Sequence, residues 1–155
     1  MVEDIMEMPK VGSKAPDFGA VDQDGNEVKL SDFRGKTVAL YFYPRDDTPG
    51  CTAEACSFRD DMEIVQEAGI KVIGVSADGM ESHKKFEKKY GLNFSLVADP
   101  DKTIIEAYGV KGVFGVARRV TFLIDKDGMI RHIWPKVNPK EHSREVLEKA
   151  KELAI

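Results

Sequence analysis

The sequence predicts an α/β protein in which a central mixed β-sheet lies between two layers of helices, a three-layer α/β/α arrangement. Apolar and β-branched runs typical of strands alternate with segments of helical periodicity. A turn signal near each end of the chain adds a hairpin, and therefore antiparallel strands. The length of 155 residues suits one domain. We therefore expect a single domain over residues 1–155, with residues 1–10 as a loose lead-in.

The first half of the chain gives the clearest element signals. Gly25, between two short alternating segments, predicts an N-terminal β-hairpin. Residues 37–43 (TVALYFY) are apolar throughout, which predicts a central strand buried on both faces and ended by Pro44. A helix is predicted over residues 51–68, with Gly69 as its C-terminal stop. The residues that define its apolar face follow 3-4-3 spacing and are Ala55, Phe58, Met62 and Val65.

The second half continues the alternation. Residues 125–128 (DKDG) predict a second hairpin. The last helix is predicted to open with Asn138 as N-cap, Pro139 in the first turn and Glu141 as a capping-box acid. The other expected elements are strands at 71–76, 94–98, 119–124 and 129–134 and helices at 82–90 and 102–108, each helix followed by a glycine.

Charge and composition exclude several classes of protein. The net charge of −4 argues against non-specific binding of nucleic acid, which requires a basic face. No apolar run approaches the roughly 20 residues of a membrane span, and the acidic N-terminus does not resemble a secretory signal. Two cysteines are too few for a secreted disulfide scaffold. We therefore expect a cytoplasmic protein that binds neither membranes nor nucleic acid.

The segment before the predicted long helix carries the chemistry. Cys51 falls in the first turn of that helix, where free backbone N–H groups and the helix dipole favour a thiolate. The Thr48 hydroxyl can reach back to the sulfur or to its partner. Pro44 and Pro49 stiffen the loop, and Gly50 permits close approach of other groups to the backbone.

The spacing of the two cysteines creates a geometric conflict. On an intact helix Cys51 and Cys56 lie about 140° apart, with Cα atoms about 8–9 Å from each other. A disulfide requires less than about 7 Å. Either the two never bond, as in a helix whose cysteines merely pack in the core, or the first turn unwinds.

A metal site is not expected. Zinc pairs use two to four intervening residues together with two further ligands. The histidines, His83, His132 and His142, are scattered through the sequence. We expect each of them to be an ordinary surface or half-buried residue.

The motif P44-RDD-T48-PG-C51-TAE-A-C56-SFRD, the strand TVALYFYP and the segment RVTFLIDKDG together resemble the peroxiredoxins, specifically the bacterioferritin-comigratory or peroxiredoxin Q group. The resemblance spans residues 11 to 153. It implies a thioredoxin-like fold and a monomeric peroxidase that requires no cofactor. The expected substrates are hydrogen peroxide and organic hydroperoxides, and the expected reductant is thioredoxin or a similar dithiol.

The same resemblance implies residue roles. Cys51 is expected to be the peroxidatic cysteine, which becomes a sulfenic acid, and Cys56 the resolving cysteine, which closes an intramolecular disulfide. The further residues implied around the sulfur are Thr48, Arg119, Pro44, which shields it, and Glu54, which orients the arginine. Two simpler interpretations stay open at this point: Arg119 as a surface charge beside Arg118, and Glu54 as a first-turn acid that complements the helix dipole.

Two other functions remain to be separated from a peroxidase. A thioredoxin-like thiol–disulfide oxidoreductase typically uses a Cys-x-x-Cys motif, which is absent here. A non-catalytic redox sensor or holdase could be switched by oxidation of Cys51 and Cys56. Catalytic turnover with a reductant distinguishes an enzyme from such a switch.

Overall fold

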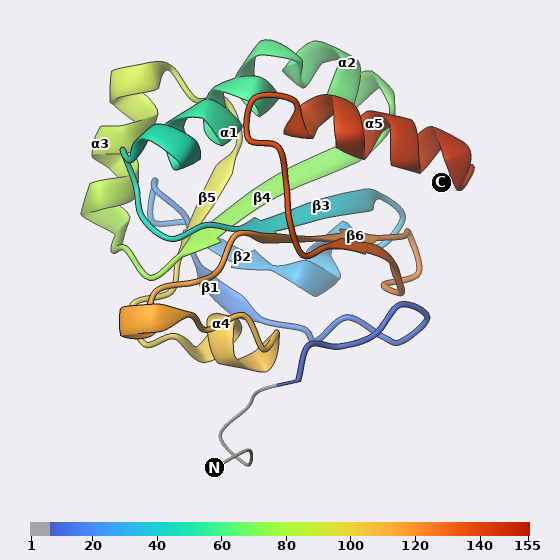
Figure 1. The fold of residues 1–155 in the computed structure, drawn as a ribbon, viewed down its shortest axis with the longest axis horizontal. Helices are drawn as coiled ribbons and strands as arrows, with labels where there is room; N and C mark the ends of the chain where they lie inside the picture. The colour runs from blue at the N-terminus through green and yellow to red at the C-terminus, as the bar shows by residue number, and fades with distance from the viewer. Residues whose placement is uncertain (1–6) are drawn as a thin grey trace.

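The computed structural model describes residues 7–155 and contains a five-stranded mixed sheet in the order β5-β4-β3-β6-β7 (Figure 1). The central strand β3 pairs in parallel with β4, which pairs in parallel with β5. On its other side β3 pairs antiparallel with β6, and β6 pairs antiparallel with β7. The strands span Thr37–Phe42 (β3), Ile70–Ser76 (β4), Ser95–Ala98 (β5), Val120–Ile124 (β6) and Ile130–Trp134 (β7). The expected mixed sheet and the expected hairpin at residues 125–128 are confirmed.

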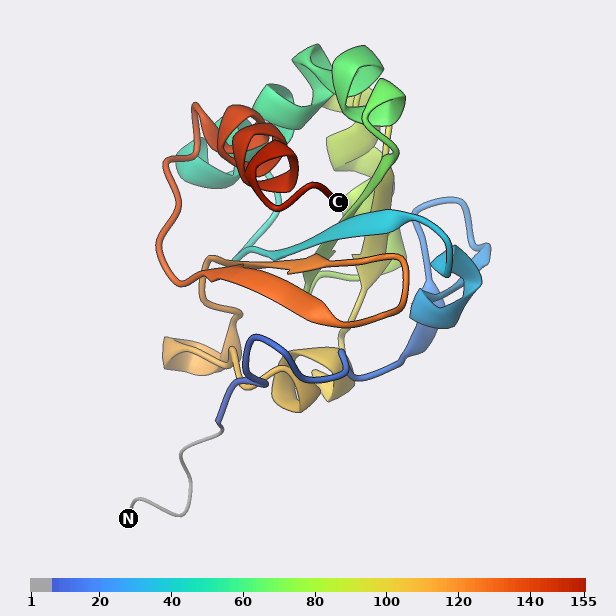
Figure 2. The same ribbon diagram turned by 90° about the vertical axis from the view of Figure 1, so that its right-hand side faces the viewer.

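Strand β3 is buried on both faces, as its composition predicts. Val38, Leu40 and Phe42 point into one hydrophobic cluster, and Ala39 and Tyr41 into the other. Helices α1, α2, α3 and α5 supply the cluster around Tyr41, and α4 covers the opposite face (Figure 2). The helices span Pro49–Asp60 (α1), Met62–Glu67 (α2), Met80–Tyr90 (α3), Thr103–Ala107 (α4) and His142–Glu152 (α5). The three expected layers are therefore present.

The N-terminal hairpin is confirmed as a separate two-stranded sheet of β1 (Gly19–Val21) and β2 (Glu27–Lys29). It lies beside the edge strand β5, to which an isolated bridge between Asp22 and Val97 connects it. The described residues also include two short 3-10 segments, η2 (Leu30–Phe33) and η3 (Val113–Gly115). Of the expected lead-in, residues 1–6 lie outside the described residues, and Met8 packs against the core.

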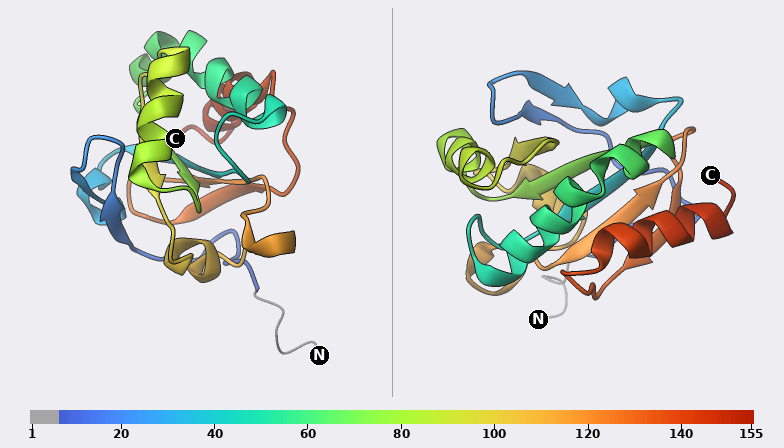
Figure 3. Two further views of the ribbon diagram at one scale, coloured as in Figure 1. Left: turned by 90° about the vertical axis from the view of Figure 1, so that its left-hand side faces the viewer. Right: turned by 90° about the horizontal axis from the view of Figure 1, so that it is seen from above.

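Two helices differ from the sequence prediction by more than one or two residues at their ends. The expected helix over 51–68 is two helices, α1 and α2, separated at Asp61, whose carboxylate accepts the Ser143 hydroxyl of α5 at 2.7 Å. Helix α5 begins at His142 rather than near Asn138, because residues 138–141 form a turn closed by the Glu141 N–H and the Asn138 carbonyl. Seen from above, α1 and α5 lie side by side over the sheet (Figure 3).

The topology brings two distant segments to one end of the sheet. Phe42, the last residue of β3, pairs with Val120, the first residue of β6. The loop that leaves β3 toward α1 therefore starts beside the segment that enters β6. Sites in α/β sheets form at such carboxyl ends of strands, close to helix N-termini. Within residues 7–155, no helix combines the length and the apolar character needed to cross a membrane.

Candidate active site

Cys51 is the third residue of α1 and is 1% exposed. The helix begins at Pro49 after Thr48, and no side chain of residues 7–155 caps its N-terminus. The first-turn N–H groups therefore have no acceptor within the helix and create a positive potential. Cys51 thus lies at a position where negative charge is stabilised electrostatically.

The Arg119 guanidinium connects the thiol to a buried carboxylate. Its Nη2 donates to Cys51 Sγ at 3.4 Å, and its Nη1 donates to Glu54 Oε1 at 2.9 Å. A Cβ atom added at Gly50 would lie 2.8 Å from Arg119 Nη2, which explains the glycine before the cysteine. The Arg119 guanidinium therefore lies against the Cys51 thiol instead of standing free at the surface.

Glu54 is completely buried and lies beyond the first turn of α1, so it is not a dipole-complementing acid. Burial raises the pKa of its carboxyl group to about 7, although the Arg119 charge opposes this shift. Its second oxygen, Oε2, and the buried Tyr41 hydroxyl have no hydrogen-bond partner among the described residues. Burial opposes the positive charge of Arg119, but Cys51 and Glu54 outweigh it and raise the pKa of the guanidinium. The Arg119 charge is therefore permanent, while Glu54 can exchange a proton near neutral pH.

A histidine that sequence reasoning placed near the surface lies behind Glu54. His142 is fully buried, with Nε2 3.9 Å from Glu54 Oε2 and 2.7 Å from Thr121 Oγ1. Its Nδ1 lies 2.8 Å from Glu145 Oε1. Burial lowers the pKa of the His142 imidazole, although Glu145 opposes this shift. Neutral His142 with a proton on Nδ1 satisfies both hydrogen bonds.

The expectation for the histidines is therefore wrong for two of the three. His83 and His142 are completely buried, and only His132 is half-buried as expected. Both buried rings are held by polar groups from other elements, a feature without a local sequence pattern.

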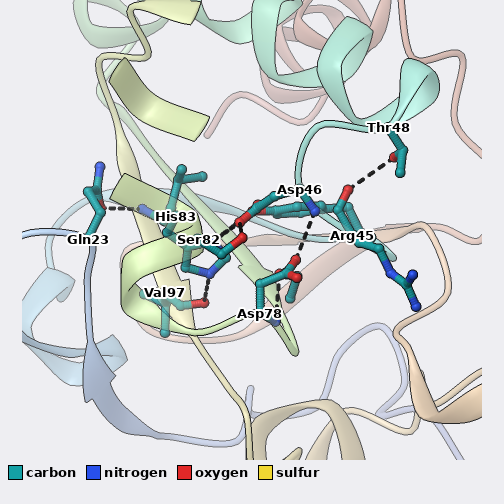
Figure 4. Close-up of polar contacts among 11 residues, drawn as sticks. Gln23, Arg45, Asp46, Thr48, Asp78, Ser82, His83 and Val97 are labelled. Carbon is teal, nitrogen blue, oxygen red and sulfur yellow. Dashed lines mark hydrogen bonds and ion pairs between the residues drawn. The ribbon is translucent and has the colours of Figure 1, made fainter. Parts of the chain in front are cut away.

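Thr48 and Pro44 flank a loop that faces α3. The Thr48 hydroxyl donates to the Arg45 carbonyl of its own loop at 3.0 Å (Figure 4). Pro44 is half-buried and follows directly on the buried Tyr43. Both residues precede α1 in the sequence, whereas Glu54 lies within that helix.

Cys56 is half-buried and shares the unbroken helix α1 with Cys51. Both thiols are free. Because residues 51 and 56 occupy opposite sides of a regular helix, their sulfur atoms cannot bond in this arrangement.

Comparison with known proteins identifies the group to which this geometry belongs. Residues 11–133 match the AhpC/TSA family. The chain is 47% identical to a putative peroxiredoxin bcp of Coxiella burnetii, over 89% of this chain and 96% of that protein. It is 44% identical to peroxiredoxin Bcp of Bacillus subtilis, over 94% of this chain and 97% of that protein.

Solved structures agree. A cysteine-to-serine mutant of PrxQ from Xylella fastidiosa superposes with a TM-score of 0.89 at 30% identity, covering 96% of this chain and 99% of that one. The peroxidoxin BcpB of Mycobacterium tuberculosis superposes with a TM-score of 0.87 at 31% identity, covering 95% and 99%. The expected thioredoxin-like fold is confirmed, and of the three functions considered from sequence the comparisons support the peroxidase. The chain belongs to the AhpC/TSA family, as a peroxiredoxin of the Bcp and peroxiredoxin Q group, and is a thiol peroxidase that uses a peroxide and a thiol reductant.

Proposed function

We propose that Cys51 is the peroxidatic cysteine of this thiol peroxidase. The observation that carries the proposal is the Arg119 guanidinium, which contacts both Cys51 Sγ and Glu54 at the start of α1. The Cys51 thiolate attacks the distal oxygen of a hydroperoxide, an S–O bond forms and the O–O bond breaks. Cys51 becomes a sulfenic acid, and the departing alkoxide or hydroxide takes up a proton as alcohol or water.

Thiolate formation alone is a small contribution to the rate. Lowering the pKa of a cysteine from about 8.5 to about 6 raises the thiolate fraction at pH 7 roughly 30-fold. The accompanying loss of nucleophilicity removes roughly tenfold of this gain. The larger contribution has to come from donors that align the peroxide and stabilise charge as its O–O bond breaks. Arg119, the Cys51 backbone N–H and the Thr48 hydroxyl are the candidates, with Glu54 orienting Arg119 and Pro44 shielding the sulfur.

Cys56 is proposed as the resolving cysteine. Its sulfur attacks the Cys51 sulfenic acid, an S–S bond forms and water leaves. Because both cysteines lie in α1, the first turn of this helix has to unwind before the bond can form. A dithiol of the thioredoxin type then reduces the disulfide and becomes a disulfide itself, restoring both thiols.

The same arrangement supports a monomer that acts as one domain. Both cysteines are in one helix, so no second chain is needed to supply a resolving thiol. The two hydrophobic clusters cover the two faces of a single sheet. Free thiols and a dithiol reductant fit the reducing cytoplasm as the place of action.

Intact mass after one equivalent of hydrogen peroxide tests these roles. We expect the wild type to lose two hydrogens, the Cys56→Ser variant to gain one oxygen, and the Cys51→Ser variant to remain unchanged. A Cys51→Ser variant that consumes peroxide as fast as the wild type would show that the peroxidatic assignment is wrong.

A further inference from the structure

The loop between β3 and α1 contains a buried carboxylate that the peroxidase chemistry described above does not use. The Asp46 side chain is 4% exposed, and both of its oxygens accept hydrogen bonds (Figure 4). Oδ1 accepts the Tyr43 hydroxyl at 2.6 Å. Oδ2 accepts the Ser82 hydroxyl at 2.8 Å and faces Nδ1 of His83 at 2.7 Å. Ser82 and His83 belong to α3, so this carboxylate fixes the loop to that helix.

The His83 ring has acceptors on both sides. Nδ1 faces the Asp46 carboxylate, and Nε2 lies 3.0 Å from the Val97 carbonyl oxygen of β5. The ring is thus held between the loop and the sheet by its two nitrogens. His83 is completely buried, so removing either member of the pair leaves the other without its hydrogen-bond partner.

Two further groups hold the same loop. The Asp46 backbone N–H donates to Asp78 Oδ2 at 2.8 Å, an oxygen that also accepts the Ser76 hydroxyl at 2.7 Å. The neighbouring Asp47 accepts Lys89 Nζ and the Tyr90 hydroxyl of α3, at 2.7 and 2.6 Å. Although Asp46, Asp78 and His83 converge within 4.8 Å, the facing carboxylate oxygens already accept protein donors, which favours a structural connection over a cation site.

The helix start on the other side of Thr48 has a different environment. Among residues 7–155, no side chain caps α1, and the Cys51 side chain receives one hydrogen bond, from Arg119. Within the loop of residues 44–48, Asp46 and Asp47 thus form hydrogen bonds to side chains of α3. The first turn of α1, which follows, does not share these contacts.

We propose that Asp46 and His83 are positioning residues of the peroxidase. They hold the loop of residues 44–48 on α3 in the arrangement that reacts with peroxide, and they thereby oppose the unwinding that the disulfide requires. The inference rests on the proposed roles of Cys51 and Cys56. Loosening the pair shifts the population away from the arrangement with an intact helix, so peroxide attack becomes slower and disulfide formation faster.

Two rates test this inference. Oxidation of Cys51 by hydrogen peroxide is followed by stopped flow in a Cys56→Ser background, and conversion of sulfenic acid to disulfide by quenched-flow mass spectrometry with Cys56 present. For Asp46→Ala and His83→Ala we expect oxidation about tenfold slower and disulfide formation about tenfold faster. His83→Asn retains a donor near the Nδ1 position and should give intermediate values for both rates.

The matched control breaks another attachment of the same helix. Lys84 of α3 pairs with Asp24 in the N-terminal hairpin, away from the loop, so Asp24→Asn should leave both rates unchanged. If Asp46→Ala fails to fold, Asp46→Asn, which retains an acceptor for Tyr43, replaces it. Two rates that stay at wild-type values, or that both fall, overturn the inference. A Cys51→Ser protein that still consumes peroxide refutes the proposed function instead, whatever the Asp46 variants do.

Discussion

The two segments that flank Cys51 are held in opposite ways. On the strand side, Asp46 and Asp47 attach the loop to α3 through several side-chain hydrogen bonds. On the helix side, the side-chain hydrogen bond of Cys51 among the described residues comes from Arg119. The difference teaches that the side-chain contacts able to oppose unwinding of the first turn of α1 lie in the preceding loop rather than in the turn itself.

The C-terminal half of α1 forms hydrogen bonds to neighbouring elements. The Ser57 hydroxyl donates to Ser143 Oγ at 2.7 Å and accepts the Ser143 N–H at 3.0 Å, which joins α1 to α5. Arg59 Nη1 donates to the Tyr90 carbonyl at 2.6 Å. The turn that carries Cys51 therefore lies between two fixed regions, and Cys56 sits next to the second of them.

The largest expected effect comes from removing Arg119, whose guanidinium donates to Cys51 at the start of α1. Arg119→Ala should slow Cys51 oxidation about 10³-fold, or about 4 kcal/mol in activation free energy, because a donor aimed at developing charge is lost. Stopped-flow rates at a pH where both proteins are fully thiolate measure this effect. Arg118→Ala is the control, because Arg118 is exposed and donates to the Gly109 carbonyl instead. Equal rates for wild type and Arg119→Ala at that pH would show that the arginine acts only by forming the thiolate.

The second prediction concerns Glu54, the buried acid of α1 that accepts a hydrogen bond from Arg119. Burial raises the pKa of Glu54 from 4.5 to about 7 against the opposing Arg119 charge, so the folded protein binds this proton more tightly than the unfolded chain. The free energy of unfolding of the wild type should therefore fall, relative to Glu54→Gln, by up to about 3 kcal/mol between pH 4.5 and 7. Urea unfolding of both proteins at pH 5 and pH 8 measures the difference.

The control for this titration is Glu63→Gln, which changes an exposed acid of α2. Over the same interval its stability difference from the wild type should change with pH by less than that of Glu54→Gln. A Glu54→Gln difference that changes no more than the Glu63→Gln difference would contradict the raised pKa of Glu54.

The third prediction tests the C-terminal half of α1, where Ser57 forms hydrogen bonds to α5. Ser57→Ala should lower the free energy of unfolding by about 2 kcal/mol, because the buried Ser143 N–H loses its acceptor. Oxidation of Cys51 should change less than twofold, since the contacts of the sulfur remain. Denaturant unfolding and stopped flow provide the two measurements, with the half-buried Ser13→Ala as a control for loss of a hydroxyl. A large loss of oxidation rate would mean that the two halves of α1 are not independent.

The smallest expected effect comes from placing a methyl group at residue 50, next to the Arg119 guanidinium. The Cβ of Gly50→Ala would lie 2.8 Å from Arg119 Nη2, so the guanidinium has to shift. We expect oxidation about tenfold slower, about 1.4 kcal/mol, without loss of stability, because alanine favours a helix more than glycine does. Gly79→Ala is the matched control, since its Cβ would meet no atom within 4 Å. An unchanged rate in Gly50→Ala would indicate that the position of the guanidinium is not critical.

Local patterns were sufficient for much of the fold. The wholly apolar segment at β3 predicted the central strand, the DG-type turns predicted both hairpins, and the position of Cys51 in a first helical turn was correct. Each of these depends on residues close together in the sequence, where periodicity and turn chemistry act directly.

The features that sequence analysis missed depend on distant partners. His83 and Asp46 are 37 residues apart, and Ser57 and Ser143, which join α1 to α5, are 86 apart. The break at Asp61 likewise coincides with a hydrogen bond from α5. A polar residue that is buried because a remote group satisfies it has the same local sequence as an exposed one, so no spacing rule identifies it.

The pairing of β3 with β6 has a consequence for the newly made chain. Cys51 and Arg119 are 68 residues apart and meet only after these two strands have come together. Contacts of such separation require the closure of a long loop, which is entropically costly. A chain still being synthesised, or one that has partly unfolded, therefore carries an ordinary cysteine without its guanidinium. With the proposed role of Arg119, fast reaction with peroxide is acquired only when β3 and β6 have paired.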